Sequence, residues 1–318
     1  MDELTLLRST RDDTREPSTD ALTAGRAALL RRIADDGATT MTAQPRKKRR
    51  WVPRLTWAAA WVAAAMTGVL VMGNVTLNAQ SAYAIDVLRS AATQTIQYAD
   101  LVAGSDQYLR SRTHARWGVC DGTGCEPNDQ ILDVYMPADP ETEWVLYRDW
   151  GNEAGVLTGA SIETTRAVDG RFYGPESSWV NVDYADIPLD GAAAYEWIDG
   201  QYIGGSASRD EDNFVRITDI LRSGLVPAPQ RAALLNALSR IPGVAATDNI
   251  ANLDGVTGVA IGRNEPLREG ERQEIIIDPN TGLVIGERAM SGATIFGWGP
   301  NQEMSLTAIE TTVVDTAP

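Results

Sequence analysis

A run of 31 residues without a charged side chain, residues 55–85, constrains this chain more than any other feature. Its apolar part, Leu55–Val75, would span about 31 Å as a helix, which matches the hydrocarbon core of a bilayer. Basic residues crowd its N-terminal side, whereas no charge follows it until Asp86. The basic residues are Arg46, Lys47, Lys48, Arg49, Arg50 and Arg54. Because basic residues stay on the cytoplasmic side, the pattern predicts a single transmembrane helix at 55–75 with the N-terminus in the cytoplasm.

A cleaved secretory leader is the alternative to such an anchor. Ala82-Tyr83-Ala84 has the small-x-small form of a cleavage site. A leader with 54 residues before its apolar core would be unusually long, because most leaders total about 15–30 residues. The sequence therefore favours a protein anchored in the cell membrane, with cleavage after Ala84 left open.

Charge divides the chain at the same segment. Residues 1–54 contain 12 basic and 8 acidic side chains, whereas the remainder contains 16 basic and 35 acidic ones. An acidic excess of this size repels phosphate backbones, so no nucleic acid is expected as a partner. The chain has one histidine and two cysteines, too few for a histidine-rich metal site or a conventional zinc finger.

The predicted cytoplasmic tail, residues 1–54, carries the signals of one short helix. Pro17 before a Ser-Thr-Asp run marks a start, and Gly37 marks a stop. Four apolar residues between them share one face: Leu22, Leu29, Leu30 and Ile33. This face is too small to form a core alone, so it predicts a surface that binds a cytoplasmic partner. The alternative is a partly ordered tail whose basic run orients the anchor and attracts anionic lipid.

Residues 76–318 are numerous enough to bury a core of their own. Apolar spacing predicts a helix at Ile85–Ile96 and two more in the middle of the domain, with the faces Phe214, Ile217, Leu221 and Leu234, Leu235, Leu238, Ile241. Strand patterns cover Tyr108–Trp117, Gln130–Met136, Thr142–Trp150, Thr164–Phe172, Trp179–Tyr184, Val256–Ile261, Gln273–Ile277, Leu283–Ala289 and Leu306–Val314. Asp278–Gly282 predicts a hairpin turn. This order predicts an α+β domain with packed helices and a mainly antiparallel, curved sheet.

Short segments along nearly the full length resemble a known family. They are Asp2-Glu3-Leu4 with Leu7-Arg8, the basic run and anchor, Asp86–Arg89 with Ala91-Ala92, Gln107-Tyr108, Ile217–Arg222, Ile241–Val244, Asp278–Gly282 and Gly286–Arg288. The chain is thereby similar to an uncharacterised actinobacterial family of single-pass membrane proteins, often encoded beside extracytoplasmic-function sigma factors. The resemblance implies a regulator with a cytoplasmic sigma factor as partner. None of these segments is a chemical signature, so the resemblance carries no catalytic residues across.

A looser likeness, which rests on element order alone, links the exterior domain to half-barrel folds. Such folds occur in lipoprotein carriers and in periplasmic regulators of anti-sigma factors. The likeness implies a curved sheet that holds a lipid or another small ligand. Four tryptophans in or near the predicted strands agree with it, although aromatic side chains there are more often ordinary core. They are Trp117, Trp144, Trp150 and Trp179.

Known catalytic motifs are missing from the sequence. Gly159–Glu163 lacks the last glycine of a nucleophile elbow, and no Gly-Lys-Ser/Thr occurs for a phosphate loop. Gly255, Gly258 and Gly262 are wrongly spaced for a dinucleotide turn. We therefore expect a protein that is not an enzyme and uses no cofactor.

Cys120 and Cys125 bracket the turn-forming sequence Asp-Gly-Thr-Gly. Outside the membrane, two cysteines in this setting most simply form a disulfide that closes a hairpin or loop. A redox pair would have two intervening residues beside a helix, and a metal site would need further ligands. The spacing favours the disulfide.

A basic stripe of four side chains alternates with other residues, which places it on one face of a predicted strand. It consists of Arg110, Arg112, His114 and Arg116. One interpretation is a solvated face that pairs across strands with acids such as Asp133, Glu143 or Asp149. The other is a docking stripe for an anionic ligand, such as a lipid head group, or for an acidic partner.

Two functions from different classes remain. The first is a non-enzymatic transmembrane regulatory or sensory protein, in one version anti-sigma-like, whose exterior domain binds a ligand or a protein. The second is a membrane-anchored extracytoplasmic module of half-barrel type that binds a lipid or small ligand. An apolar pocket of several hundred Å³ in the exterior domain favours ligand binding, because a domain that docks a protein can be solid.

Overall fold

The computed structural model describes residues 81–120, 125–151, 155–159, 161–174, 179, 182–293 and 298–318. All of them belong to one unit, Ala63–Pro318. The predicted transmembrane helix at 55–75 and the tail face of Leu22, Leu29, Leu30 and Ile33 lie outside the described residues. Among the helices that are described, none combines the length and the apolar character needed to cross a bilayer.

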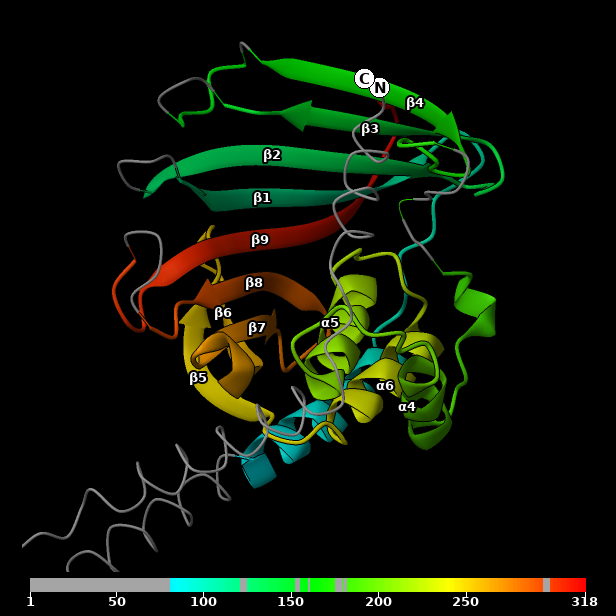
Figure 1. The fold of residues 1–318 in the computed structure, drawn as a ribbon. Helices are drawn as coiled ribbons and strands as arrows, with labels where there is room; N and C mark the ends of the chain where they lie inside the picture. The colour runs from blue at the N-terminus through cyan, green and yellow to red at the C-terminus, as the bar shows by residue number, and fades with distance from the viewer. Residues whose placement is uncertain are drawn as a thin grey trace, which may run out of the picture. The chain divides into compact units, whose positions relative to one another are not determined.

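A helix at residues 81–97 opens the described chain, and strands, helices and strands follow in turn (Figure 1). The first strands are β1 (Tyr108–Cys120), β2 (Cys125–Pro137), β3 (Glu143–Asp149) and β4 (Ile162–Val168). The helical part holds the 3-10 turn η1 (Tyr184–Asp186) and the helices α4 (Gly191–Asp199), α5 (Arg209–Leu221) and α6 (Ala228–Leu238). The last part holds β5 (Ala245–Ala251), β6 (Thr257–Glu265), η2 (Pro266–Arg268), β7 (Glu271–Ile277), β8 (Val284–Met290) and β9 (Glu303–Val314). The predicted α+β class is confirmed.

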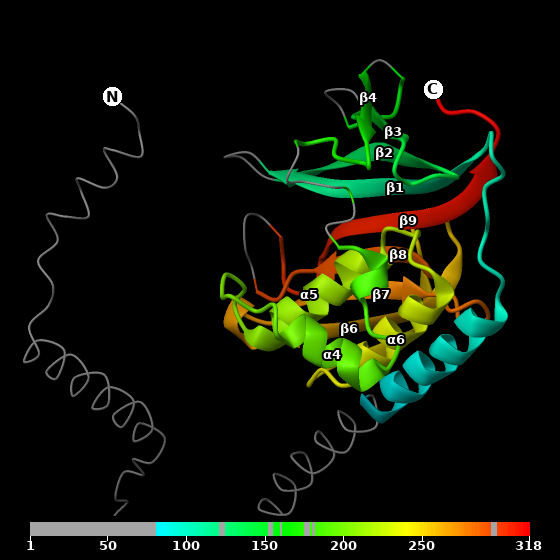
Figure 2. The same cartoon turned by 90° about the vertical axis from the view of Figure 1, so that its right-hand side faces the viewer.

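The nine described strands form one sheet in the order β4-β3-β2-β1-β9-β8-β7-β6-β5. Every neighbouring pair is antiparallel. The sheet is thus two meanders, β1–β4 and β5–β9, joined where β9 pairs with β1. It curves strongly (Figures 1 and 2), as the right-handed twist of so wide a sheet requires.

The helical layer lies on one half of this sheet. Figure 2 shows α4, α5 and α6 in front of the β5–β9 half, whereas β1–β4 extend beyond them. The main core joins the helices to that half and includes Phe214, Ile217, Leu234, Ile261 and Ile275, none more than 1% exposed. A separate, smaller cluster of Val134, Trp144, Leu146 and Leu225 lies on the inner face of the β1–β4 half. We call the face turned toward the helices the inner face and the opposite one the outer face.

Two predicted strands differ from the structure. The strand predicted over Thr164–Phe172 ends at Val168, because Asp169 and Gly170 take positive φ angles of 58° and 62° and turn the chain. The strand predicted at Trp179–Tyr184 is wrong where the chain is described, since Tyr184 begins a 3-10 turn. Asp183 caps this turn by accepting a hydrogen bond from the backbone N–H of Ala185 at 2.9 Å, which favours a turn over a strand.

The end of α5 meets the sheet through charged side chains. Arg222, the C-cap of α5, lies 3.6 Å from Glu287 of β8 and 3.1 Å from Asp219. Burial is the main cause that raises the pKa of Glu287 to about 7, against the attraction of Arg222. Asp219 adds to the rise by repulsion between the two carboxylates. Near pH 7 the carboxyl group of Glu287 therefore stays partly protonated, whereas an exposed glutamate would be ionised.

Glu287→Gln should stabilise the protein at neutral pH. Folding raises the pKa of Glu287 from 4.5 to about 7, so the folded state binds the proton more tightly and the free energy of unfolding falls as pH rises between these values. We expect a gain of about 1–3 kcal/mol above pH 7 that vanishes near pH 4.5, since 22% of the side chain still reaches solvent. Chemical unfolding at both pH values measures it. Glu310→Gln, at a site 66% exposed, is the control, and an equal gain at both pH values would contradict the expectation.

Candidate functional site

The basic stripe lies on one face of β1, as its alternation predicts. Its register with β2 and β9, together with Asp254 from the connection between β5 and β6, brings acidic residues close to it. The pairs are Arg110 with Glu310 at 3.8 Å, Arg112 with Asp133 at 3.7 Å, His114 with Asp254 at 2.5 Å and Arg116 with Asp129 at 2.7 Å. Cross-strand pairing therefore accounts for much of the stripe, while its role in docking stays a prediction.

Of the three acids expected to pair with the stripe, only Asp133 does so. Glu143 pairs instead with Arg166 of β4 at 3.2 Å. Asp149 accepts hydrogen bonds from the backbone N–H groups of Gly151 and Gly159 at 3.1 and 3.2 Å. These two acids belong to β3, which β2 separates from β1, so their distance from the stripe follows from strand order.

The two cysteines stand opposite each other in the β1–β2 hairpin. The register pairs Cys120 with Cys125. The intervening residues 121–124 and the side chain of Cys120 lie outside the described part of the chain. The backbone placement suits a disulfide that closes this hairpin, and the bond itself stays a prediction.

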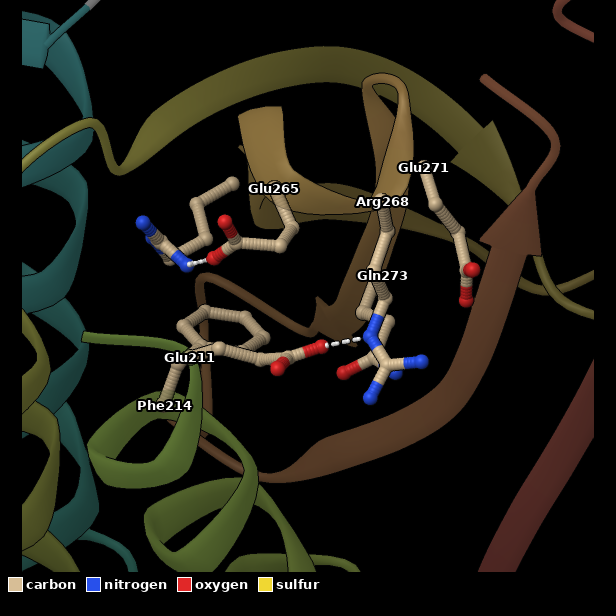
Figure 3. Close-up of a pocket in the computed structure, with 7 residues that line it drawn as sticks. Glu211, Phe214, Glu265, Arg268, Glu271 and Gln273 are labelled. Atoms are coloured by element: carbon tan, nitrogen blue, oxygen red, sulfur yellow. Dashed lines mark hydrogen bonds and ion pairs between the residues drawn. The ribbon is translucent and has the colours of Figure 1, made fainter. Parts of the chain in front are cut away.

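A charged cluster lies at the start of α5, next to the β6–β7 hairpin (Figure 3). Glu211 and Arg268 point toward each other and form an ion pair, and Arg263 pairs with Glu265 at 2.7 Å. The space between these side chains is only about 10 Å³, room for one water at most. The cluster thus links the start of α5 to the β6–β7 hairpin, and it offers no room for a ligand.

A groove of about 1020 Å³ opens on the inner face of the β1–β4 half. Its apolar lining on the side of the sheet consists of Met136, Pro140, Trp144 and Val168. The opposite side is formed by Val182, Tyr184, Leu225 and Pro227, from the segments before α4 and between α5 and α6. The groove therefore lies on the half of the sheet that the helical layer leaves open.

Trp144 forms a fixed part of this lining. It is 4% exposed, and its indole N–H donates a hydrogen bond to the carbonyl oxygen of Pro140 at 2.7 Å. The ring packs against the backbone of Gly170, where an added Cβ would lie 3.0 Å from a ring carbon. Because its one polar atom is bonded, the indole presents an apolar surface.

Gly170→Ala should disturb both the fold and the groove. Gly170 has a φ of 62°, which alanine adopts only with strain, and its Cβ would press on Trp144. We expect a loss of about 1–3 kcal/mol in the free energy of unfolding, with a changed near-UV circular dichroism signal. Gly243→Ala is the matched control, because its φ of 79° brings the same kind of strain without a contact within 4 Å. Equal losses in the two variants would argue against the contact with Trp144.

Tyr184 contributes an uncharged polar group to the opposite side of the groove. Its hydroxyl lies 3.0 Å from the hydroxyl of Ser223, and burial raises the pKa of Tyr184 above its ordinary value. The charged residues of the groove are three acids and one base: Glu141, Asp169, Asp183 and Arg171. Arg171 pairs with Asp169 at 3.0 Å. The groove is thus apolar within and acidic at its charged positions.

In the described part of the chain, no group of three or more His, Cys, Asp or Glu side chains is placed to hold a metal ion.

No protein-family model matches the chain. Neither the curated proteins nor the solved structures contain a significant match to it. The resemblance inferred from short sequence segments therefore stays an expectation, and the functional proposal depends on the geometry of the groove.

Proposed function

We propose that the domain holds the apolar chain of an amphiphile in this groove and signals its presence across the membrane. The observation that carries the proposal is the groove itself, about 1020 Å³ in volume and lined largely by apolar side chains. Ligand pockets in proteins typically measure about 300–1,000 Å³ and have mainly apolar walls. A domain of the anchored type inferred from the sequence would meet such molecules at the membrane surface.

The charges of the groove favour a ligand with an uncharged or cationic head group. Glu141, Asp169 and Asp183 outnumber Arg171, and Arg171 is already paired with Asp169. An anionic head group at this position would be repelled. A neutral glycerolipid satisfies both requirements, because it combines long apolar chains with hydroxyl and ester groups.

A chain of contacts from the groove to helix 81–97 supports the signalling part of the proposal. Arg231 of α6, 5% exposed, donates hydrogen bonds to the Val226 carbonyl oxygen at 2.6 Å and to Asp100 at 2.8 Å. It also bonds to the hydroxyl of Thr95 in helix 81–97. Val226 lies between two residues of the groove lining, and Asp100 accepts the N–H of Ala228 at 2.7 Å. A ligand that moves this link would therefore also move the helix next to the predicted anchor.

In the regulatory version of the proposal, ligand binding outside the membrane changes the binding of a protein to the cytoplasmic tail. A sigma factor that binds the tail face of Leu22, Leu29, Leu30 and Ile33 is the partner that the sequence resemblance implies. Co-purification of the full chain with the sigma factor encoded beside it tests this part. Absence of a complex at micromolar concentration would exclude the sigma factor as partner. The proposal would then be reduced to a ligand-binding module.

Thermal unfolding of the full chain in mild detergent tests the ligand class. A long-chain monoacylglycerol should raise the melting temperature by about 2–5 °C through binding to the folded state. The fatty acid with the same chain should raise it less, because its carboxylate meets the acidic residues of the groove. Equal shifts would contradict the assignment of the head group, and no shift with any monoacylglycerol or diacylglycerol would contradict the proposed function.

A further inference from the structure

A second cavity lies on the outer face of the β1–β4 half, opposite the groove. It measures about 580 Å³ and is lined by side chains of β1, β2 and β3 and by residues 316–318. Side chains alternate along β2, so Asp133 points outward while Leu132 and Val134 pack on the inner apolar cluster. Arg110 and Arg112 of the basic stripe line this cavity. The stripe is thereby divided into a part that faces a cavity and a part that only pairs with acids.

Asp133 is a buried carboxylate with an unused oxygen. The residue is 3% exposed. Its Oδ2 accepts a hydrogen bond from the Tyr135 hydroxyl at 3.4 Å and lies 3.7 Å from Arg112. Its Oδ1 is buried and has no hydrogen-bond partner among the described groups. Burial raises the pKa of Asp133, against the attraction of Arg112 and Arg110.

Two more buried polar atoms without partners belong to the next two strands of the sheet, β1 and β9. They are Nε of Arg110 and Oγ1 of Thr312, each unbonded within the described part of the chain. The two residues stand directly opposite each other in the β1–β9 register. An unpaired buried polar group destabilises the folded state, and folded proteins seldom leave several of them together. Asp133 and Arg110 both line the cavity, so a ligand bound there would supply partners for Oδ1 of Asp133 and Nε of Arg110.

The chemistry of the cavity selects a ligand with charges of both signs. A simple anion would be repelled by Asp133 and by Asp149, which also lines the cavity, and a simple cation by Arg110 and Arg112. The segment after β9 already lies along this face: the side-chain amide of Gln107 donates a hydrogen bond to the Asp315 carboxylate at 2.8 Å, and Arg166 donates one to the main-chain oxygen of Pro318. Residues 316–318 line the cavity, so the surface accommodates a peptide segment.

We propose that this outer cavity binds a short zwitterionic peptide. The peptide carboxylate lies against Arg110 and Arg112, and its N–H donors reach the free oxygen of Asp133. Its apolar side chains contact Ile131 and Leu157, which also line the cavity. The site is separate from the groove on the inner face, so either assignment can fail while the other stands.

Calorimetric titration of the full chain with trialanine, as the probe, tests this proposal. We expect saturable binding that Asp133→Asn and Arg112→Gln each weaken at least about tenfold, because each removes a charge-assisted hydrogen bond. Arg116→Gln is the matched control. It removes a charge from the same stripe, but Arg116 bonds to Asp129, so affinity should stay within about twofold of the wild type.

Chemical variants of the probe separate the alternatives. N-acetyl-trialanine amide, which lacks both charges, and glutarate, which has two negative charges, should each bind at least about tenfold more weakly than trialanine. Equal affinity for either of them, an equal loss in Arg116→Gln, or no saturation up to about 10 mM trialanine would overturn the proposal. Melting temperatures of the variants show that each is folded, and Arg110→Gln replaces any variant that is not.

Discussion

Met136→Trp should reduce ligand binding in the groove at least about tenfold, because the indole ring occupies part of its volume. Met136 lines the groove from β2 and packs on the inner apolar cluster of Val134 and Trp144. The larger ring should therefore also cost about 1–3 kcal/mol in the free energy of unfolding. Photo-crosslinking of the full chain, in vesicles that contain a diazirine-bearing diacylglycerol, measures the loss as label on the residues that line the groove.

Ile162→Trp is the matched control for this variant. Ile162 of β4 is 50% exposed. It pairs with Asp149, which lies on the outer face of the sheet, and it is not part of the groove lining. Labelling of the groove should remain within about twofold of the wild type. If the two substitutions lower the labelling equally, the effect is not specific to the groove, and the assignment of the ligand to the groove is wrong.

Arg231→Met should cost about 3–5 kcal/mol in the free energy of unfolding, because removing one member of a buried polar network leaves the others without partners. The substitution leaves three groups without their hydrogen bonds from Arg231: the Thr95 hydroxyl, the Asp100 carboxylate and the Val226 carbonyl oxygen. Methionine keeps much of the volume, so the loss measures hydrogen bonding more than packing. Chemical unfolding of the full chain gives the value.

Arg166→Gln provides the comparison for Arg231→Met. Arg166 is also paired with an acid, Glu143, but both side chains are about half exposed, at 46% and 54%. Its loss should cost less than about 1 kcal/mol. A cost below about 1 kcal/mol for Arg231→Met as well would show that the link between α6 and helix 81–97 is weak, and would remove the support it gives to signalling.

Local sequence signals predict much of the fold. Helix α5 has the predicted buried face of Phe214, Ile217 and Leu221, and Ser208 caps it by accepting the N–H of Glu211 at 3.0 Å. The turn at Asp278–Gly282 is confirmed, since the N–H of Asp278 bonds to the carbonyl of Leu283 at 3.0 Å. Period and capping are properties of neighbouring residues, so a single sequence reveals them.

Two elements escape such reasoning because their local signals are weak. Helix α4 consists mainly of alanine and aromatic residues after Gly191, and its clearest signal is Asp190, whose side chain accepts the N–H groups of Ala192 and Ala193. Strand β5 (Ala245–Ala251) has little β-branched or aromatic content and pairs with β6 through an irregular register. Tertiary contacts decide such segments more than propensity does.

The groove escapes prediction for a different reason. Its lining comes from β2, β3, β4 and two connecting segments, which only the folded chain brings together. The sequence does not distinguish Trp144, which lines the groove, from Trp150, which does not. In the structure, Cζ of Arg148 lies 3.3 Å from the centroid of the Trp150 ring, and Trp150 is 39% exposed. Packing between distant segments determines which half of the sheet the helices cover. The spacing of apolar residues along the chain does not reveal it.

The site of cross-linking in the wild-type full chain tests the central claim most directly. Residue-level mass spectrometry after photolysis with the diazirine-bearing diacylglycerol should find label on Met136, Trp144 and Leu225, which line the groove from both sides. Label confined to residues 55–75, or spread over outer-face residues such as Tyr135 and Tyr147 while the groove residues stay unlabelled, would contradict the proposal that this groove holds the apolar chain of an amphiphile.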